Sequence, residues 1–238
     1  EEEEEEQWNL RRIAKLRNGL LRHLRDRVPG VTDPYSYIGS RFSSFCWHVE
    51  DDFLYSISYL QGGAPKVWYG VPASCHKDVE RVHERIFRNL NKQDNVLAKR
   101  TFIINPAVFQ KEGIPVYKSI QRVRQFIVTF PRSYHSGFNA GLNYAEAVNL
   151  ANTSWLFSGL VANHIRLTNP EHGAAYVPPV IPTEEIIVKA AQAIAARRKL
   201  QHKAAVGGAI DKHMDDAIST STTTTATTTT ATTTTTTT

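Results

Sequence analysis

Two side chains suited to metal binding lie one residue apart in a stretch rich in aromatic residues. His48 and Glu50 fall within residues 45–66, FCWHVEDDFLYSISYLQGGAPK, and Lys66 ends that stretch after a Gly-Gly-Ala-Pro turn. Aromatic and β-branched residues favour strands, and side chains two apart on a strand point to the same face. The sequence therefore predicts that an imidazole and a carboxylate stand side by side, as two ligands of one metal ion would.

A third ligand is available much later in the chain, at His135. It follows a strand-like run at residues 125–130 and precedes a glycine-containing turn. Two imidazoles and one carboxylate on one face of a metal, with other positions open, form the arrangement of non-haem Fe(II) oxygenases. The alternative is a surface pair of His48 and Glu50 with His135 as a satisfied core histidine. A bare His-x-Glu with a distant histidine favours that alternative, because the pattern is short and common.

Composition limits the class of protein. The chain has 238 residues, 41% of them hydrophobic, which is enough for one domain with a substantial core. No apolar run approaches the roughly 20 residues needed to span a membrane, and the acidic N-terminus is unlike a secretory signal. Two cysteines exclude a disulfide framework and a thiolate zinc cluster. We expect a soluble, intracellular protein that makes no membrane contact.

The charge distribution is uneven. The net charge of +5 includes six leading glutamates, so the rest of the chain is distinctly basic. A basic surface suits nucleic acid or chromatin and would allow non-specific contact with DNA. The alternative, that lysines and arginines merely solvate the surface, is equally compatible with the charge.

Several elements must position the candidate ligands. Apolar spacing predicts an amphipathic helix from Asn9 to the residue before Pro29, and a second helix over residues 77–90 with His76 and His83 on its surface. Strands are expected at residues 35–39, 66–71, 125–130 and 144–155, and residues 96–116 read as loop and short strand. A hairpin between the strands flanking the Gly-Gly-Ala-Pro turn would bring Lys66 back toward His48.

The predicted fold class is mainly β with peripheral helices, a double-stranded β-helix of the jelly-roll or cupin type. The predicted domains are an acidic disordered lead at residues 1–7, a catalytic domain at 8–166, a connector and C-terminal helices at 167–218, and a disordered threonine-rich tail at 219–238. The connector is the stiff Tyr176–Pro182 segment, and an alanine-rich helix follows from Thr183.

Longer motifs favour the metal site over its alternative. In order along the chain they are FSSFCWHVED, Pro65-Lys66-x-Trp68-Tyr69, KEGIPV at residues 111–116, FPRSYHSGFNAG and NYAEAVN. From Trp8 to Arg166 the sequence resembles the JmjC class of Fe(II)- and 2-oxoglutarate-dependent histone lysine demethylases. Several long motifs in the right order are far harder to obtain by chance than a metal triad alone.

The resemblance implies a role for each matching residue. His48, Glu50 and His135 would be the iron ligands, and Lys66 would pair with the distal carboxylate of the cosubstrate 2-oxoglutarate. The other positions implied are Phe45, Ser56, Ser58 and Trp68 around the cosubstrate, and Tyr37, Gly30, Asn139 and Asn149 around the substrate. Ser58 is a departure, because the family usually has asparagine there, and serine shortens a polar arm near the cosubstrate.

The activity implied is oxidation of N-methyl groups on a methylated histone H3 tail or nucleosome, with lysine 4 favoured, in the nucleus. The reaction would use Fe(II) as its cofactor and would consume 2-oxoglutarate and dioxygen. It would release formaldehyde, succinate and carbon dioxide. Two alternatives remain open: a JmjC protein hydroxylase that leaves a stable alcohol, and a non-catalytic chromatin-binding module. The complete set of His48, Glu50, His135 and Lys66 argues against the second.

Overall fold

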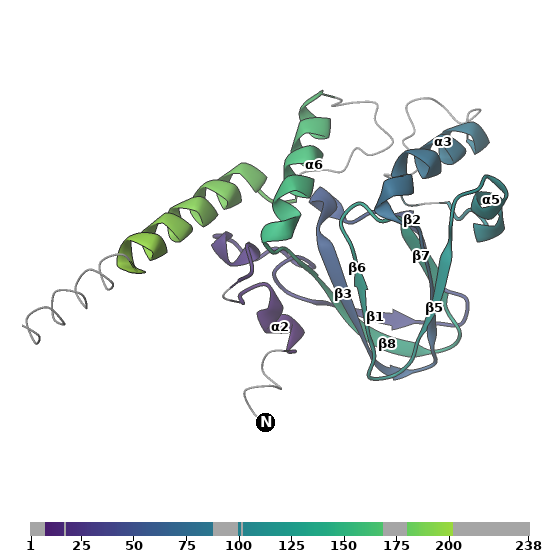
Figure 1. Ribbon diagram of the computed structural model, residues 1–238. Coiled ribbons are helices and arrows are strands. Elements are labelled where there is room, and N and C mark those ends of the chain that lie inside the picture. The colour runs from purple at the N-terminus through teal and green to yellow at the C-terminus, as the bar shows by residue number, and fades with distance from the viewer. Residues whose placement is uncertain (1–7, 17, 88–99, 101, 169–179, 202–238) are drawn as a thin grey trace, which may run out of the picture. The chain divides into compact units, whose positions relative to one another are not determined.

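The described part of residues 1–189 is built around two antiparallel sheets of four strands each (Figure 1). The structure is a computed structural model that describes residues 8–16, 18–87, 100, 102–168 and 180–201. The chain divides into two compact units, residues 1–189 and 190–238, and both sheets belong to the first. Of the second unit the structure describes residues 190–201, which are helical.

Each of the two sheets has four strands in an order that differs from their order in the sequence. The first has the order β1 (Tyr35–Gly39), β8 (Asn143–Leu150), β3 (Tyr55–Gly63) and β6 (Phe126–Thr129). The second has the order β2 (Ser44–His48), β7 (His135–Asn139), β4 (Lys66–Gly70) and β5 (Tyr117–Gln121). Neighbours in each order come from distant parts of the sequence, as in a jelly roll. The predicted mainly β, double-sheet fold is confirmed.

Short helices surround the sheets. They are α2 (Leu10–Ile13), α3 (His76–Ile86), α5 (Pro106–Lys111) and α6 (Leu156–Thr168), with 3-10 turns η1 (Leu21–His23), η2 (Asp51–Phe53), η3 (Ala73–Cys75) and η4 (Thr153–Trp155). Figure 1 shows α3 and α5 at the end of the sheets where β2 and β7 are labelled. The main core cluster there includes Trp47, Val82, Phe109 and Tyr134. No helix among the described residues has the length and apolar content that a membrane crossing requires.

The long N-terminal helix was a wrong prediction. Only Leu10–Ile13 is α-helical, and a separate 3-10 turn follows at Leu21–His23. Gly19 interrupts the pattern, and its cost in a helix interior is about 1 kcal/mol. The next amide, that of Leu20, donates to the Ala151 carbonyl at 2.8 Å instead of continuing a helix. The apolar spacing therefore reflected two short separate segments, of which the first packs on the sheet through Leu10 and Ile13.

The predicted hairpin around Lys66 was also wrong. β3 and β4 lie in different sheets, so the chain crosses between sheets instead of folding back on itself. Gly63 has a φ of +90°, and the Ala64 amide donates to the Leu142 carbonyl. Lys66 pairs instead with Gln121 of β5 and Asn139 of β7. His48 and Lys66 both belong to this second sheet and line the same cavity.

Three local predictions need correction. Residues 106–111 form helix α5, capped by the Asn105 side chain, because proline fits the first turn of a helix. The segment after His135 is strand β7 and not a turn. On α3, His83 is buried and not on the surface, and His76 is half-buried. The strands predicted at residues 35–39, 66–71 and 125–130 are confirmed as β1, β4 and β6. The strand predicted at 144–155 ends at Leu150, because residues 153–155 form η4, and β5 and α6 were not anticipated.

Some predictions fall outside the described residues. These are the acidic lead at residues 1–7, the threonine-rich tail at residues 219–238, and most of the Tyr176–Pro182 connector. The helix predicted after the connector is present at residues 183–201.

Candidate metal centre and adjoining cavity

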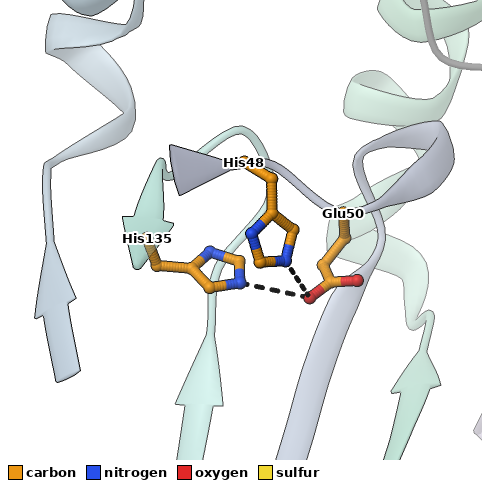
Figure 2. A group of neighbouring side chains, drawn as sticks. All are labelled: His48, Glu50 and His135. Carbon is orange, nitrogen blue, oxygen red and sulfur yellow. Dashed lines mark ion pairs between the residues drawn. The ribbon is translucent and has the colours of Figure 1, made fainter. Parts of the chain in front are cut away.

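The neighbouring residues His48 and Glu50 and the distant His135 bring their side chains together at one end of a cavity. The Nε2 atom of His135 lies 3.3 Å from Oε1 of Glu50, and Nε2 of His48 lies 3.9 Å from the same oxygen (Figure 2). One potential ligand atom from each residue lies within 4.8 Å of the other two. The imidazole rings are 4.3 Å apart between centroids. This is close enough for all three to share one ion.

The backbone fixes which nitrogen of each imidazole faces the centre. Nδ1 of His48 is 2.7 Å from the Cys46 carbonyl oxygen, and Nδ1 of His135 is 3.0 Å from that of Ser133. A carbonyl oxygen only accepts, so each Nδ1 carries the proton and each Nε2 presents a lone pair. Such partners orient histidines that bind metals. Both lone pairs therefore point toward the carboxylate of Glu50.

The second oxygen of Glu50 is held separately. The Asn149 amide donates to Oε2 of Glu50 at 3.0 Å and to the Tyr55 carbonyl at 3.1 Å. Burial raises the pKa of the Glu50 carboxyl, but a proton on His135 or His48 and the hydrogen bond from Asn149 outweigh burial and lower it. Burial, and then His135, lower the pKa of His48 to about 3. An anionic carboxylate facing two neutral imidazoles through lone pairs is a donor set that a divalent cation fits.

Local structure explains how the ligands converge. His48 ends β2 directly opposite His135, which begins β7, so the two are cross-strand partners. Glu50 follows the strand in extended conformation, with φ −68° and ψ 152°. Gly137 lets β7 approach its neighbours, because a Cβ there would lie 2.1 Å from the Val67 carbonyl oxygen and 2.5 Å from the Phe45 ring. The turn after Glu50 then leads the chain into the other sheet.

A cavity of about 160 Å³ extends from the three ligands between the sheets. Every site residue predicted from sequence except Asn139 lines it, and Ala145, Ala147 and Val148 of β8 complete the lining. The small side chains of Ala145 and Ala147 leave room in the interior. The cavity therefore joins the candidate metal centre to Lys66.

Lys66 is a buried ammonium group that pairs with no acidic side chain in the described part of the chain. Its exposed fraction is 7%, and its Nζ lies 5.7 Å from the centroid of the Phe45 ring. Burial lowers its pKa, and among the described residues no carboxylate lies within ion-pairing distance. A buried cation is costly unless an anion accompanies it. This end of the cavity is therefore built for a negatively charged ligand.

Sequence reasoning missed Gln121, which shapes the same end of the cavity. Its side chain is fully buried and accepts from the Trp68 indole at 2.9 Å. Its amide donates to the carbonyls of Ser58 and Gln125, both at 3.0 Å. Gln121 thus ties a strand of each sheet together and fixes the Trp68 ring, whose centroid is 4.7 Å from that of Phe45. Gln121 follows a segment that was predicted as loop and short strand, so nothing in the sequence indicated its role in the cavity.

The remaining predicted residues occupy different places. Ser56 lies beside Thr129, with a hydroxyl separation of 2.5 Å, and Ser58 is buried in the cavity wall. Tyr37 and Gly30 line the cavity, and burial raises the pKa of Tyr37, with a smaller contribution from Glu50. Asn139 lies apart from the cavity.

The contacts of Asn139 explain its separate position. Its amide donates to the carbonyl and hydroxyl of Ser43 at 3.1 and 2.9 Å, and its oxygen accepts from Asn143 at 2.9 Å. These bonds hold the turn before β2 against β7. Its polar atoms are engaged by the protein itself.

Comparisons with known proteins agree with this geometry. Residues 35–150 match the family model described as JmjC domain, hydroxylase. The chain is 41% identical over 182 residues to Lysine-specific demethylase JMJ17 of Arabidopsis thaliana, covering 76% of this chain and 14% of that protein. It is 40% identical over 192 residues to Lysine-specific demethylase JMJ706 of Oryza sativa subsp. japonica, covering 77% and 22%.

A third relative extends the comparison to animals. Lysine-specific demethylase 5B of Gallus gallus is 42% identical over 150 residues, which are 63% of this chain and 10% of that protein. The chain therefore spans less than a quarter of the length of these curated relatives.

Proposed function

Because this chain belongs to the JmjC-domain family, we propose that it is an Fe(II)- and 2-oxoglutarate-dependent oxygenase that demethylates lysine side chains of histones. The observation that carries the proposal is the cavity with a different binding site at each end. At one end two imidazoles and a carboxylate converge, and at the other no carboxylate of the described residues lies within ion-pairing distance of the buried Lys66 ammonium. A cosubstrate with a carboxylate at its far end would span the two.

The metal ligands are proposed to be His48, Glu50 and His135. Bound Fe(II) would supply the activation of dioxygen, with 2-oxoglutarate as the source of two electrons and the N-methyl group as the site oxidised. The protein's own part is to hold the Nε2 lone pairs in place through the Cys46 and Ser133 carbonyls. Fixed ligands and open coordination positions are what such oxygenases require.

The cosubstrate is proposed to lie between the metal ligands and Lys66. The Lys66 ammonium would pair with its distal carboxylate, and this pair would be strong because both charges are removed from water. Phe45 and Trp68, in edge contact at 4.7 Å between centroids, would pack against its carbon chain and exclude water. Ser56 and Ser58 supply hydroxyl groups on the opposing sheet.

The substrate side is proposed to be the part of the cavity lined by Tyr37, Gly30 and Asn149. A methylated lysine cation favours aromatic faces and polarised C–H···O contacts, which the Tyr37 ring and nearby oxygen atoms provide. We favour the histone H3 tail, with lysine 4 as the target, because AEAVN and FSSFCWHVED most resemble the subgroup acting there. A nuclear location and contact with nucleosomal DNA through basic residues accompany this proposal.

The catalytic domain is proposed to be residues 8–166, which contain both sheets. Demethylation completes when the hydroxylated methyl group leaves as formaldehyde, so that nitrogen regains a proton and the lysine is restored. The overall balance is one N-methyl group, one 2-oxoglutarate and one dioxygen converted to the amine, formaldehyde, succinate and carbon dioxide. Formaldehyde is therefore the product that identifies the reaction.

The test is incubation of the protein with methylated H3 peptides, Fe(II), ascorbate and 2-oxoglutarate. We expect formaldehyde release together with loss of one methylene unit from the peptide by mass spectrometry. Hydroxylation, the activity for which the matching family is named, would instead add one oxygen atom to the peptide. Succinate formation without any change in a panel of peptides would contradict a histone substrate.

A further inference from the structure

The turn directly after Glu50 has an unusual backbone and a buried acid. Asp52 and Phe53 both have positive φ, 49° and 51°. Their exposed fractions are 1% and 2%. Left-handed backbone is uncommon for a residue other than glycine, and for a bulky residue it is strained. Strain of this kind persists only where surrounding contacts over-determine the conformation.

Asp52 makes those contacts with parts of the chain more than 100 positions away. Oδ1 of Asp52 accepts from the Arg166 guanidinium of α6 at 2.7 Å. Oδ2 accepts from the backbone amides of Val180 and Ile181 at 3.1 and 3.3 Å. The backbone carbonyl of Asp52 accepts from the Trp155 indole at 3.0 Å. Both carboxylate oxygens are thus used, which is how a charge is tolerated when buried.

These contacts connect to Glu50 through a single short turn. The Phe53 amide donates to the Glu50 carbonyl at 3.0 Å, which closes the turn on the ligand itself. Figure 1 shows α6 near the start of β3, and α6 packs against η2. The turn decides the direction in which the chain leaves Glu50 and passes into β3. A change in its conformation would rotate the Glu50 backbone and displace its carboxylate from the two imidazoles.

We propose that Asp52 is a positioning residue, through which Arg166 and residues 180–181 hold Glu50 in the geometry needed to bind the metal. The inference rests on the proposed function, since Glu50 is taken as a metal ligand. Affinity for the ion then depends on α6 and on a segment beyond residue 179, neither of which contributes a ligand. Outer partners of this kind typically change metal affinity by about 10–100-fold when lost.

The test uses Asp52→Asn in the full chain. Asparagine has almost the same shape and tolerates left-handed backbone at least as well. It has one accepting oxygen and one donating nitrogen, so it cannot accept from both Arg166 and the two amides. We expect Mn²⁺, used as the metal alone, to bind about tenfold or more weakly than to the unaltered protein. At saturating Co²⁺, the visible absorption bands should shift, because the ligand geometry has changed.

Two further variants remove a donor and leave the carboxylate in place. Arg166→Met removes the guanidinium, and Val180→Pro removes one backbone amide. We expect both to weaken Mn²⁺ binding in the same direction, and they decide the question if Asp52→Asn fails to fold. The matched control is Glu112→Gln, which breaks the 2.7 Å pair with Arg85 between α3 and α5 without touching the turn. The control should bind Mn²⁺ like the unaltered protein.

A second control separates positioning from stability. Val82→Ala removes part of a fully buried side chain in the core under α3 and should lower Tm without altering Mn²⁺ affinity or the Co²⁺ bands. Unchanged Mn²⁺ affinity and Co²⁺ bands in the folded Asp52 and Arg166 variants would overturn the proposal. Absence of Mn²⁺ binding to the unaltered protein would instead contradict the proposed function, so the two failures are distinguishable.

Discussion

Two regions of this protein each contain two histidines and a glutamate, and they differ in whether these side chains converge on a point where a metal ion could bind. The candidate metal centre has two imidazoles and a carboxylate in His48, His135 and Glu50. Helix α3 carries two imidazoles and a carboxylate in His76, His83 and Glu80, spaced to lie along one face. We call these three residues the α3 set. Among the described residues, only the metal centre brings three potential ligand atoms within 4.8 Å.

Hydrogen bonding alone does not separate the two groups. Nδ1 of His76 is 2.8 Å from the Ala73 carbonyl, and Nδ1 of His83 is 2.9 Å from that of Val79. The Nε2 atoms of both are buried and have no hydrogen-bond partner among the residues that the structure describes. Their surroundings differ, because the His83 ring packs against the aromatic rings of Phe109 and Phe87. The comparison shows that convergence on one point, and not histidine burial or tautomer, distinguishes a metal site from a packed helix.

The carboxylates differ in the same way. Glu80 has a proton donor of its own, because its carboxylate accepts from the Tyr134 hydroxyl at 3.2 Å. Burial raises the pKa of Glu80. Glu50 lies 3.3 and 3.9 Å from the Nε2 atoms of His135 and His48, and the Asn149 amide helps to lower its pKa. One carboxylate is satisfied within the protein, and the other requires a cation.

The largest expected effect is on metal binding. His48→Ala should abolish both Mn²⁺ binding and turnover while leaving the fold largely intact, because it removes a ligand and no core side chain. His83→Leu, the matched change in the α3 set, should leave Mn²⁺ affinity unchanged. Calorimetric titration of both variants checks this. Turnover retained in His48→Ala would count decisively against the assigned site.

The next effect concerns the far end of the cavity. Lys66→Met keeps most of the volume but removes the charge, so the 2-oxoglutarate concentration for half-maximal rate should rise at least about thirtyfold, from a loss of roughly 2 kcal/mol. Peptide binding should change much less. Lys118→Met is the control, since Lys118 is an exposed lysine on the neighbouring strand β5. Equal effects of Lys66→Met on cosubstrate and peptide would contradict its role.

Within the α3 set, His83 should make the free energy of unfolding depend on pH. Burial lowers the pKa of His83 to about 4, below its ordinary value of 6.5. The unfolded chain therefore binds a proton that the folded protein rejects between these values. Stability is fully present above pH 6.5 and falls as pH drops toward 4, by about 3 kcal/mol from this group. In His83→Leu the decline of unfolding free energy over this window should be shallower.

Denaturant unfolding of metal-free protein at several pH values measures this decline. His48 contributes in the same direction, because burial also lowers its pKa, so the slope should be reduced and not removed. At pH 7, His83→Leu should cost less than about 1 kcal/mol or stabilise, since the lost Nε2 had no partner. An unchanged slope would show that His83 titrates normally.

The smallest effect is expected at Glu80. Glu80→Gln keeps an oxygen that can accept from Tyr134, so stability at pH 7 should change by less than about 1 kcal/mol. Mn²⁺ affinity should not change. Thermal unfolding and calorimetric titration check the two outcomes. A measurable loss of metal affinity would make the α3 set part of a metal site and would break the comparison.

The sequence predicted the parts of the site that depend on strand periodicity and long motifs. His48, Glu50, Lys66 and His135 lie within such motifs. Alternation along β3 and β8 sends Ser56 and Ser58, and Ala145, Ala147 and Asn149, to the cavity, whereas Glu50 lies just past the end of β2. Asn139 belongs to the same motif but its amide binds the Ser43 turn. Motif membership therefore located the region, and only three-dimensional contacts separate lining residues from supporting ones.

The errors in the fold have a common physical origin. Apolar periodicity reports only on local structure. The hairpin predicted at Lys66 and the helix predicted from Asn9 do not form, because contacts with distant strands set the path of the chain at both places. Gly63 and Gly19 are the points where the chain changes direction, and neither spacing nor propensity indicates which sheet follows. His83 was expected on the surface because helical spacing gives no information on what packs against α3. Gln121 was missed because its partners come from three different segments.

The central claim is that one ion is shared by His48, Glu50 and His135. It is tested most directly by a crystal structure of the protein grown with Mn²⁺, examined by anomalous diffraction. The account predicts one strong peak bonded to Nε2 of both histidines and to a carboxylate oxygen of Glu50, with Lys66 at the other end of the same cavity. A peak bound elsewhere, or none within bonding distance of these three atoms at saturating Mn²⁺, would contradict it.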